Sequence, residues 1–213
     1  MKKKILNLLS LLCNAATVIL VAYSVLCFYF GGGVGNMTGA GAHIFVYYTT
    51  DSNILAALLC LPMLACNIRA LCGHDEVPLW VNICKWVGTV CIMLTFMVVM
   101  CFLGVLMGYR AMLSGVNLFL HLICPLLCLV SFLFFERGTL PKRELCWTLL
   151  PTVIYGIVYF VQVVVIGAEN GGWPDFYLFN RAGHWYLTVL LIMGCVLLMA
   201  IVFRRVRRSI EKK

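Results

Sequence analysis

Six long apolar stretches constrain this chain more than any other feature of its sequence. Each one is close to or longer than the roughly 20 residues that an α-helix needs to cross a bilayer core of ~30 Å. A helix satisfies its own backbone hydrogen bonds, so it can stand in lipid. The expected fold is therefore an all-α integral membrane protein, a six-transmembrane-helix bundle, with spans at Ile5–Phe30, Ile44–Ala65, Leu79–Leu106, Val116–Phe135, Leu145–Ile166 and His184–Phe203.

The composition agrees with a lipid environment. Of the 213 residues, 63% are hydrophobic and only 11% are charged, whereas about a quarter of the residues in a soluble domain are charged. The segments between the apolar stretches are too short to hold a separate soluble domain. We therefore expect a single polytopic membrane domain over residues 1–213, with neighbouring helices antiparallel.

The distribution of basic residues predicts the orientation of the chain. With the N-terminus inside, 13 of the 16 Lys and Arg residues lie on the inner side, and Arg110 and Arg181 lie outside. The remaining one, Lys85, falls near the inner end of the third span, where its side chain can extend to the interface. This bias predicts a multi-pass protein of the cell membrane with both termini cytoplasmic. It also explains the net charge of +8 without a nucleic-acid partner.

Cysteine and histidine give no sign of a metal or a cofactor. The 12 cysteines are scattered through the apolar stretches and form no CxxC pair, so we interpret them as small core residues. The spacing of His43, His121 and His184 has no metal signature. A haem would need paired axial ligands, and His121 is the only histidine in the middle of a span.

Polar side chains inside spans are costly, and their positions are therefore informative. At 1.5 Å per residue, Thr49, His121 and Gln162 should each lie about 8–10 Å inward from the outer ends of their helices. We therefore expect one site in the outer half of the bilayer, with few polar groups in the inner half. The candidate residues are Thr49, Thr50, Asp51 and Asn53 in the second span, Asn117 and His121 in the fourth, and Tyr155, Tyr159 and Gln162 in the fifth.

These residue types suggest nucleophilic chemistry on an ester. A threonine hydroxyl is a weak nucleophile until a histidine takes its proton and a third group orients that histidine. Thr49 or Thr50 would be the nucleophile, His121 the base, and Asp51 or Asn117 the orienting group. Simpler interpretations remain for each residue: a threonine can bond to its own helix backbone, and Asp51 can be solvated at the interface.

The same residues resemble the androgen-induced family of membrane proteins and their bacterial relatives. The resemblance extends from about Phe45 to Phe179 and keeps the order and spacing of the spans. It rests on residues 48–53 (YTTDSN) before an apolar helix, on His121 followed by Pro125, on Pro151 and Tyr155, and on residues 173–176 (WPDF).

The animal members of that family are six-span threonine hydrolases, which cleave fatty acid esters of hydroxy fatty acids with an intramembrane Thr and His. The resemblance implies the same roles for a threonine and for His121 here. The Thr-x-x-Ser-Asn spacing matches the bacterial pattern and points to Thr49, whereas the animal spacing points to Thr50 as the alternative nucleophile.

The leading hypothesis is an intramembrane lipid-ester hydrolase that acts on fatty-acyl esters in the outer leaflet. An acyltransferase would use the same residues with another acceptor in place of water. The alternative of a different class is a lipid-binding or transport protein without covalent chemistry. Transporters typically show internal repeats and polar groups at the midplane, and this chain shows neither, which favours the enzyme. The expected partner is a membrane lipid or a fatty-acyl ester substrate, and the sequence does not identify a protein partner.

Overall fold

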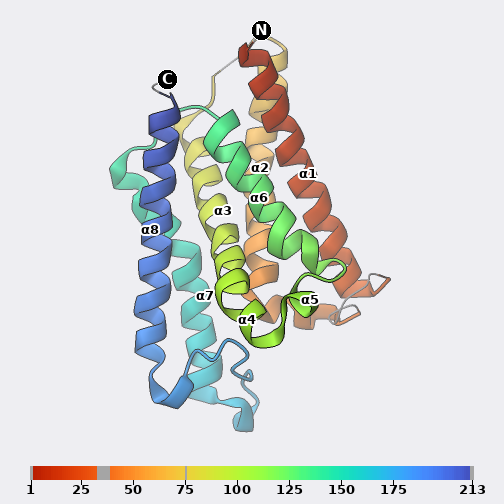
Figure 1. Cartoon of the computed structure of the whole chain (residues 1–213), viewed down its shortest axis with the longest axis vertical. Helices are drawn as coiled ribbons and strands as arrows, with labels where there is room; N and C mark the ends of the chain where they lie inside the picture. Colours follow the sequence, from red (N-terminus) through yellow and green to blue (C-terminus); the bar gives the residue numbers. More distant parts are fainter. Residues whose placement is uncertain (1, 33–38, 75, 212–213) are drawn as a thin grey trace.

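The computed structural model describes residues 2–32, 39–74 and 76–211, and these residues form helices and connecting turns without a strand. The long helices run side by side along the longest axis of the molecule (Figure 1). The start of the first helix and the end of the last helix lie at the same end of the bundle. We call this end the terminal end and the other the distal end.

Five helices in the described residues are long and apolar enough to cross a membrane, which supports a multi-pass membrane protein. A sixth apolar helix, Phe119–Phe135, is shorter. The five long helices cover Lys3–Phe30, Tyr48–Leu71, Leu79–Met107, Lys142–Ile166 and Trp185–Glu211.

These helices contain several changes of helical type. In chain order the elements are α1 (Lys2–Phe30), η1 (Gly41–Val46), α2 (Tyr48–Leu71), α3 (Leu79–Val98), η2 (Val99–Leu103), α4 (Gly104–Met107), α5 (Tyr109–Met112), η3 (Phe119–Ile123), α6 (Cys124–Val130), η4 (Ser131–Phe135), η5 (Lys142–Thr148), α7 (Leu150–Phe160), η6 (Val161–Ile166), η7 (Ala168–Asn170), η8 (Arg181–Gly183) and α8 (Trp185–Glu211). The elements η2, η3, η4 and η6 are π-helical turns, and the other η elements are 3₁₀ turns.

The second span begins later than its sequence predicts. The apolar residues Ile44 and Val46 lie buried in the 3₁₀ turn η1, and Tyr47 then adopts an extended backbone with φ −99° and ψ 127°. Helix α2 starts only at Tyr48. The expected depth of Thr49 was therefore wrong: Thr49 is the second residue of α2 and lies in its first turn. Hydropathy alone could not distinguish a buried 3₁₀ turn from the start of a spanning helix.

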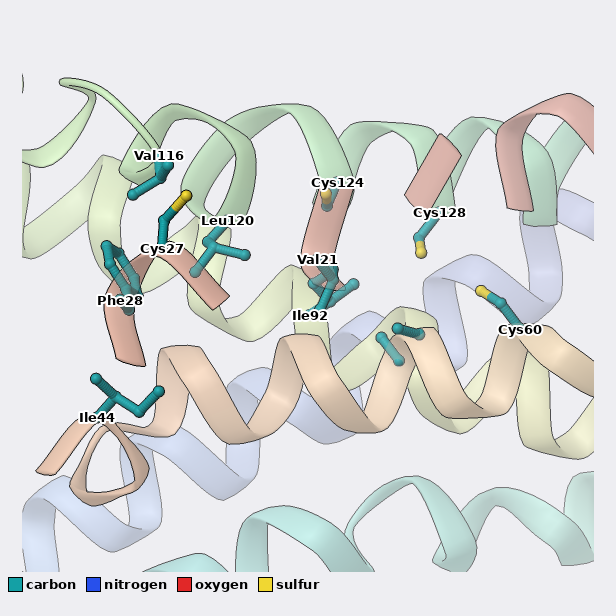
Figure 2. Close-up of a cluster of buried hydrophobic side chains, with 12 residues drawn as sticks. Val21, Cys27, Phe28, Ile44, Cys60, Ile92, Val116, Leu120, Cys124 and Cys128 are labelled. Carbon is teal, nitrogen blue, oxygen red and sulfur yellow. The ribbon is translucent and has the colours of Figure 1, made fainter. Parts of the chain in front are cut away.

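One core cluster lies between α1, α2, α3 and the helix formed by η3, α6 and η4, and a second one lies between α3, η4 and α8. Figure 2 shows the side chains of the first cluster, which come from these helices, from η1 and from the turn before η3. They include Val21, Cys27, Phe28, Ile44, Cys60, Ile92, Val116, Leu120, Cys124 and Cys128. Helices α2 and α3 approach closely at Gly88, where an added Cβ would lie 3.2 Å from the Cα of Ala56. Six of the cysteines are buried, in agreement with their interpretation as core residues, although Cys72, Cys101 and Cys146 are exposed.

A buried ion pair lies in the half of the bundle toward the terminal end. Lys85 of α3 is only 1% exposed, and its Nζ lies 3.6 Å from Oε1 of Glu136. The ammonium also donates hydrogen bonds to Oδ1 of Asn14 at 2.6 Å and to Sγ of Cys60 at 3.2 Å. Lys85 therefore does not extend to the interface, and that expectation was wrong.

The ion pair belongs to a larger polar network. Glu136 follows the π turn η4, and its Oε1 accepts hydrogen bonds from Oγ of Ser131 at 2.6 Å and from Nδ2 of Asn14 at 3.1 Å. Asn14 also donates to the carbonyl of Ser10, whose hydroxyl accepts a hydrogen bond from Asn67. The half of the bundle toward the terminal end thus contains more buried polar groups than the sequence predicted, and Glu136 is a core residue rather than a loop residue.

Candidate functional site

A cavity of about 800 Å³ opens between α3, α7 and α8 toward the distal end of the bundle. Most of its lining is aliphatic or aromatic. The hydroxyl groups that line it belong to Thr49, Thr95, Thr152, Thr188, Tyr48, Tyr155, Tyr159 and Tyr177. Cavities that hold a small organic molecule typically have volumes of ≈ 300–1,000 Å³ and a mainly apolar lining with a few polar groups. The size and lining are those of a site for an apolar ligand with one polar end.

Thr49 lies at the polar side of this cavity, next to Tyr177. The hydroxyl of Tyr177 accepts a hydrogen bond from the backbone N–H of Tyr48 at 3.1 Å and forms a side-chain hydrogen bond with Thr49. Burial raises the pKa of Tyr177 to about 12, and the hydrogen bonds with Thr49 and the Tyr48 backbone partly oppose this rise. Tyr177 is therefore a neutral phenol at physiological pH and cannot act as the base for Thr49.

The segment 173–180 covers one side of the cavity, and Asp175 fixes its fold. The carboxylate of Asp175 accepts hydrogen bonds from the backbone N–H groups of Phe179 and Asn180, each at 2.8 Å. It also accepts a hydrogen bond from the hydroxyl of Tyr159 at 3.2 Å. Aromatic side chains surround Tyr159 at centroid distances of 5.2–6.1 Å, namely Phe176, Tyr177, Phe179, Tyr155 and Trp173.

Two further tyrosines join α7 to the start of α2. The hydroxyl of Tyr155 donates to the carbonyl of Val46 at 2.8 Å, and the hydroxyls of Tyr48 and Thr152 lie 2.9 Å apart within hydrogen-bond distance. These contacts hold the first turn of α2 against the cavity wall, so the position of Thr49 is set by α7 as well as by its own helix.

His121 lies elsewhere, in the π turn η3, and it is 7% exposed. Its Nδ1 lies 2.5 Å from the carbonyl oxygen of Met112. A carbonyl oxygen only accepts hydrogen bonds, so Nδ1 must carry the proton, and the neutral ring keeps its lone pair on Nε2. This is the tautomer that a general base requires. Among the described residues no hydrogen bond joins Thr49 to His121, and His121 does not line the cavity.

Asn53 connects the two regions. Its Nδ2 donates to the carbonyl of Thr49 at 2.8 Å and to the carbonyl of Leu120, the residue before His121, at 3.1 Å. One amide group therefore bridges the backbone at Thr49 to the backbone beside His121. The Oδ1 atom of Asn53 is buried and has no hydrogen-bond partner within the described part of the chain.

The other predicted site residues have different surroundings. Tyr155 and Tyr159 line the cavity together with Thr49, whereas Thr50, Asp51, Asn117 and Gln162 do not. Thr50 and Asn117 are buried, and Asp51 and Gln162 are half-buried. The structure thus brings Thr49, Tyr155 and Tyr159 around one space and separates them from His121 and Asn117.

Sequence reasoning missed several residues of the cavity. Thr152 and Thr188 each occur singly in an apolar helix, and Tyr177 lies in a loop, so no periodic pattern marked them. The WPDF segment was noticed through the family resemblance, but its packing on Tyr159 was not expected. Arg181 and His184 also line the cavity; their place just before the last span was the only available signal.

No protein-family model, curated protein or solved structure matches the chain.

Proposed function

We propose that this chain is a membrane-embedded hydrolase of fatty-acyl esters, with Thr49 as the nucleophile. The observation that carries the proposal is the position of Thr49 on the wall of an apolar cavity of about 800 Å³. An acyl chain can occupy the apolar part between α3, α7 and α8, which leaves its ester group beside Thr49. The resemblance to the androgen-induced family supports the same chemistry; its bacterial spacing points to Thr49, and its animal spacing points to Thr50.

The proposed reaction has two steps. Oγ1 of Thr49 attacks the ester carbonyl carbon while Nε2 of His121 takes the hydroxyl proton. The proton then passes to the oxygen of the departing alcohol, and the acyl group remains bound to Thr49 as an acyl-threonine. In the second step the same histidine takes a proton from water, whose oxygen attacks the carbonyl carbon of the acyl-threonine. The bond from that carbon to Oγ1 then breaks, the histidine returns the proton to Oγ1 of Thr49, and the fatty acid leaves. The Asn53 bridge and the Nδ1–H tautomer of His121 support this assignment, although the ring must move toward the cavity for its Nε2 to reach Thr49.

Tyr177 is suited to stabilise the oxyanion that forms in the attack. It accepts a hydrogen bond from the Tyr48 backbone and remains protonated, so its own proton can turn to the carbonyl oxygen of an ester held at Thr49. A donor placed where negative charge develops lowers the barrier, and its loss typically costs about 10²–10³ in rate.

A covalent probe tests this proposal. The purified full-length protein in detergent should react with a fluorophosphonate that carries a long alkyl chain, because the probe places an electrophilic phosphorus at the nucleophile. Thr49→Ala should abolish labelling. Thr50→Ala is the matched control, since Thr50 is the neighbouring buried threonine outside the cavity lining, and it should keep labelling. Labelling that persists in Thr49→Ala would contradict the assignment.

A second candidate function is binding of a fatty-acyl lipid without chemistry. One observation favours it: His121 does not line the cavity and its Nδ1 is held by Met112. Under this alternative the protein binds a fatty acid or its ester, and neither Thr49→Ala nor Thr50→Ala changes the binding affinity strongly. The fluorophosphonate probe then forms no covalent adduct. Measurement of fatty-acid binding beside probe labelling therefore distinguishes the two functions.

We also propose that the short helix Phe119–Phe135 is a sixth span, and that both chain ends lie in the cytoplasm of a cell-membrane protein. A reporter active only in the cytoplasm should give signal when fused after Glu211, whereas the same reporter inserted at Ser114 should be silent. The excess of Lys and Arg near the terminal end supports this orientation. A silent fusion after Glu211 would contradict the proposed topology.

A further inference from the structure

A second, smaller cavity lies at the terminal end of the bundle. Its volume is about 240 Å³, and it is enclosed by the chain that follows η4 and by the last turns of α8. The residues that line it are Gly138, Thr139, Leu140, Pro141, Arg204, Arg207, Arg208 and Glu211. It shares no residue with the Thr49 cavity, so whatever it binds is separate from the proposed hydrolase site.

The cavity wall carries an excess of positive charge. Three of its eight residues are arginines, and Glu211 is the only acidic one. Arg204 donates from Nε to the carbonyl of Leu140 at 2.5 Å, which holds the loop against α8. A concave site with three guanidinium groups and one carboxylate is complementary to an anion of charge −1 to −2, as a phosphate group is.

Arg207 is a buried arginine of the cavity wall with hydrogen-bond donors that have no acceptor among the described residues. Its side chain is 1% exposed. Its Nη2 donates to Oδ1 of Asn82 at 2.7 Å, and its guanidinium carbon lies 4.7 Å from the ring centre of Phe132. Its Nε and Nη1, however, have no hydrogen-bond partner within the described residues. Buried donors without acceptors are costly, and a guanidinium group fits a phosphate with two parallel hydrogen bonds.

Glu211 occupies part of the place that an anion would take. Its Oε1 lies 3.5 Å from Nε of Arg207 and accepts a hydrogen bond from the backbone N–H of Gly138 at 2.8 Å. The carboxylate sits on an exposed turn of α8, so a stronger acceptor could displace it and satisfy both Arg207 and the Gly138 N–H group. Glu211 is therefore an internal competitor for the site.

We propose that this cavity binds the phosphate group of an anionic phospholipid from the leaflet at the terminal end. The cavity lies at the end of a spanning helix, where headgroups are found. The exposed apolar residues Leu190 and Leu197 continue the same side of α8 at seven-residue spacing from Arg204, which places them for the acyl chains. The bound phosphate accepts hydrogen bonds from Arg207 and Arg208, and the loop 138–141 closes beside it. The site fixes α8 and the chain after η4 to one lipid.

Native mass spectrometry of the full-length protein in detergent tests this site. Titration with phosphatidylglycerol should give one tightly bound lipid, whereas phosphatidylcholine, whose choline neutralises the phosphate, should bind at least about tenfold more weakly. Inorganic phosphate at millimolar concentration should compete with phosphatidylglycerol, because both place a phosphate at Arg207. A protein that binds inorganic phosphate but does not bind phosphatidylglycerol would support the anion site and overturn its assignment to a lipid.

Three variants make the test specific. Arg208→Gln should weaken phosphatidylglycerol binding about tenfold, as expected for the loss of a charged hydrogen bond. Arg205→Gln is the matched control: it is an exposed arginine on the same helix outside the cavity, and its screened charge should change binding by less than about twofold. Glu211→Gln should strengthen binding, since it removes the competing carboxylate. Equal losses in Arg205→Gln and Arg208→Gln, or weaker binding by Glu211→Gln, would overturn the proposal.

Discussion

Lys85→Met should destabilise the protein by about 3–5 kcal/mol, the usual cost of removing one partner of a buried ion pair. Lys85 is 1% exposed and contacts Glu136, Asn14 and Cys60, so its loss leaves a carboxylate and an amide oxygen in the core without their cation. For a chain of this length such a change corresponds to a melting temperature lower by about 6–20 °C.

The cysteines of this protein provide the measurement. Cys60 and Cys128 are buried beside Lys85, so a thiol-reactive fluorophore should report their exposure on heating. Lys142→Met, at an exposed lysine, is the matched control and should leave the melting temperature nearly unchanged. The double variant Lys85→Met with Glu136→Gln should recover much of the loss, because it removes both charges together. If Lys85→Met is as stable as the wild type, the ion pair between Lys85 and Glu136 is not formed.

The second large effect concerns catalysis. If Thr49 attacks the ester and His121 takes its proton, Thr49→Ala and His121→Ala should each lower turnover of a long-chain fatty-acyl ester by about 10³-fold or more. The double variant should be little worse than either single one, because members of a catalytic unit act together. Asn117→Ala should be milder, since Asn117 is buried outside the cavity lining.

Thermal unfolding with the same thiol-reactive fluorophore separates loss of catalysis from loss of folding. Variants that melt like the wild type and have no activity support the mechanism. Full turnover in Thr49→Ala together with loss in Thr50→Ala would move the nucleophile by one residue. If the rate loss in the double variant equals the product of the losses in Thr49→Ala and His121→Ala, the two residues act in separate steps.

The helical class and five of the approximate spans could be predicted from hydropathy, because those apolar stretches form helices of the length that a bilayer requires. The boundary at Ile44 could not, because the burial of Ile44 under α1 depends on tertiary contacts that a window of sequence does not contain. The same limit applies to Lys85. Its partners Asn14 and Glu136 are 71 and 51 residues away in the chain, so a positional rule for charged residues placed it at the interface.

The site was predicted in part. The polar run 49–53 drew attention to the first turns of α2, and Thr49 from this run lines one cavity together with Tyr155 and Tyr159. The equal-depth argument for His121 and Gln162 assumed uniform helices with fixed ends. Both residues lie in π turns, in which the rise and the angle per residue differ from those of an α-helix. Tyr177 could not be found, because a loop residue has no periodicity to reveal which helix it contacts.

The π turn η4 makes the buried ion pair depend on the number of residues in that turn. The backbone N–H group of Glu136 bonds to the carbonyl of Ser131, five residues earlier, at 3.0 Å, and this wide turn carries the carboxylate back over the Ser131 hydroxyl. Deletion of one residue between Ser131 and Glu136 would allow an ordinary α-turn with every side chain chemically intact, yet it would rotate the carboxylate by about 100° away from Lys85. Insertions and deletions here are therefore as harmful as the loss of a charge.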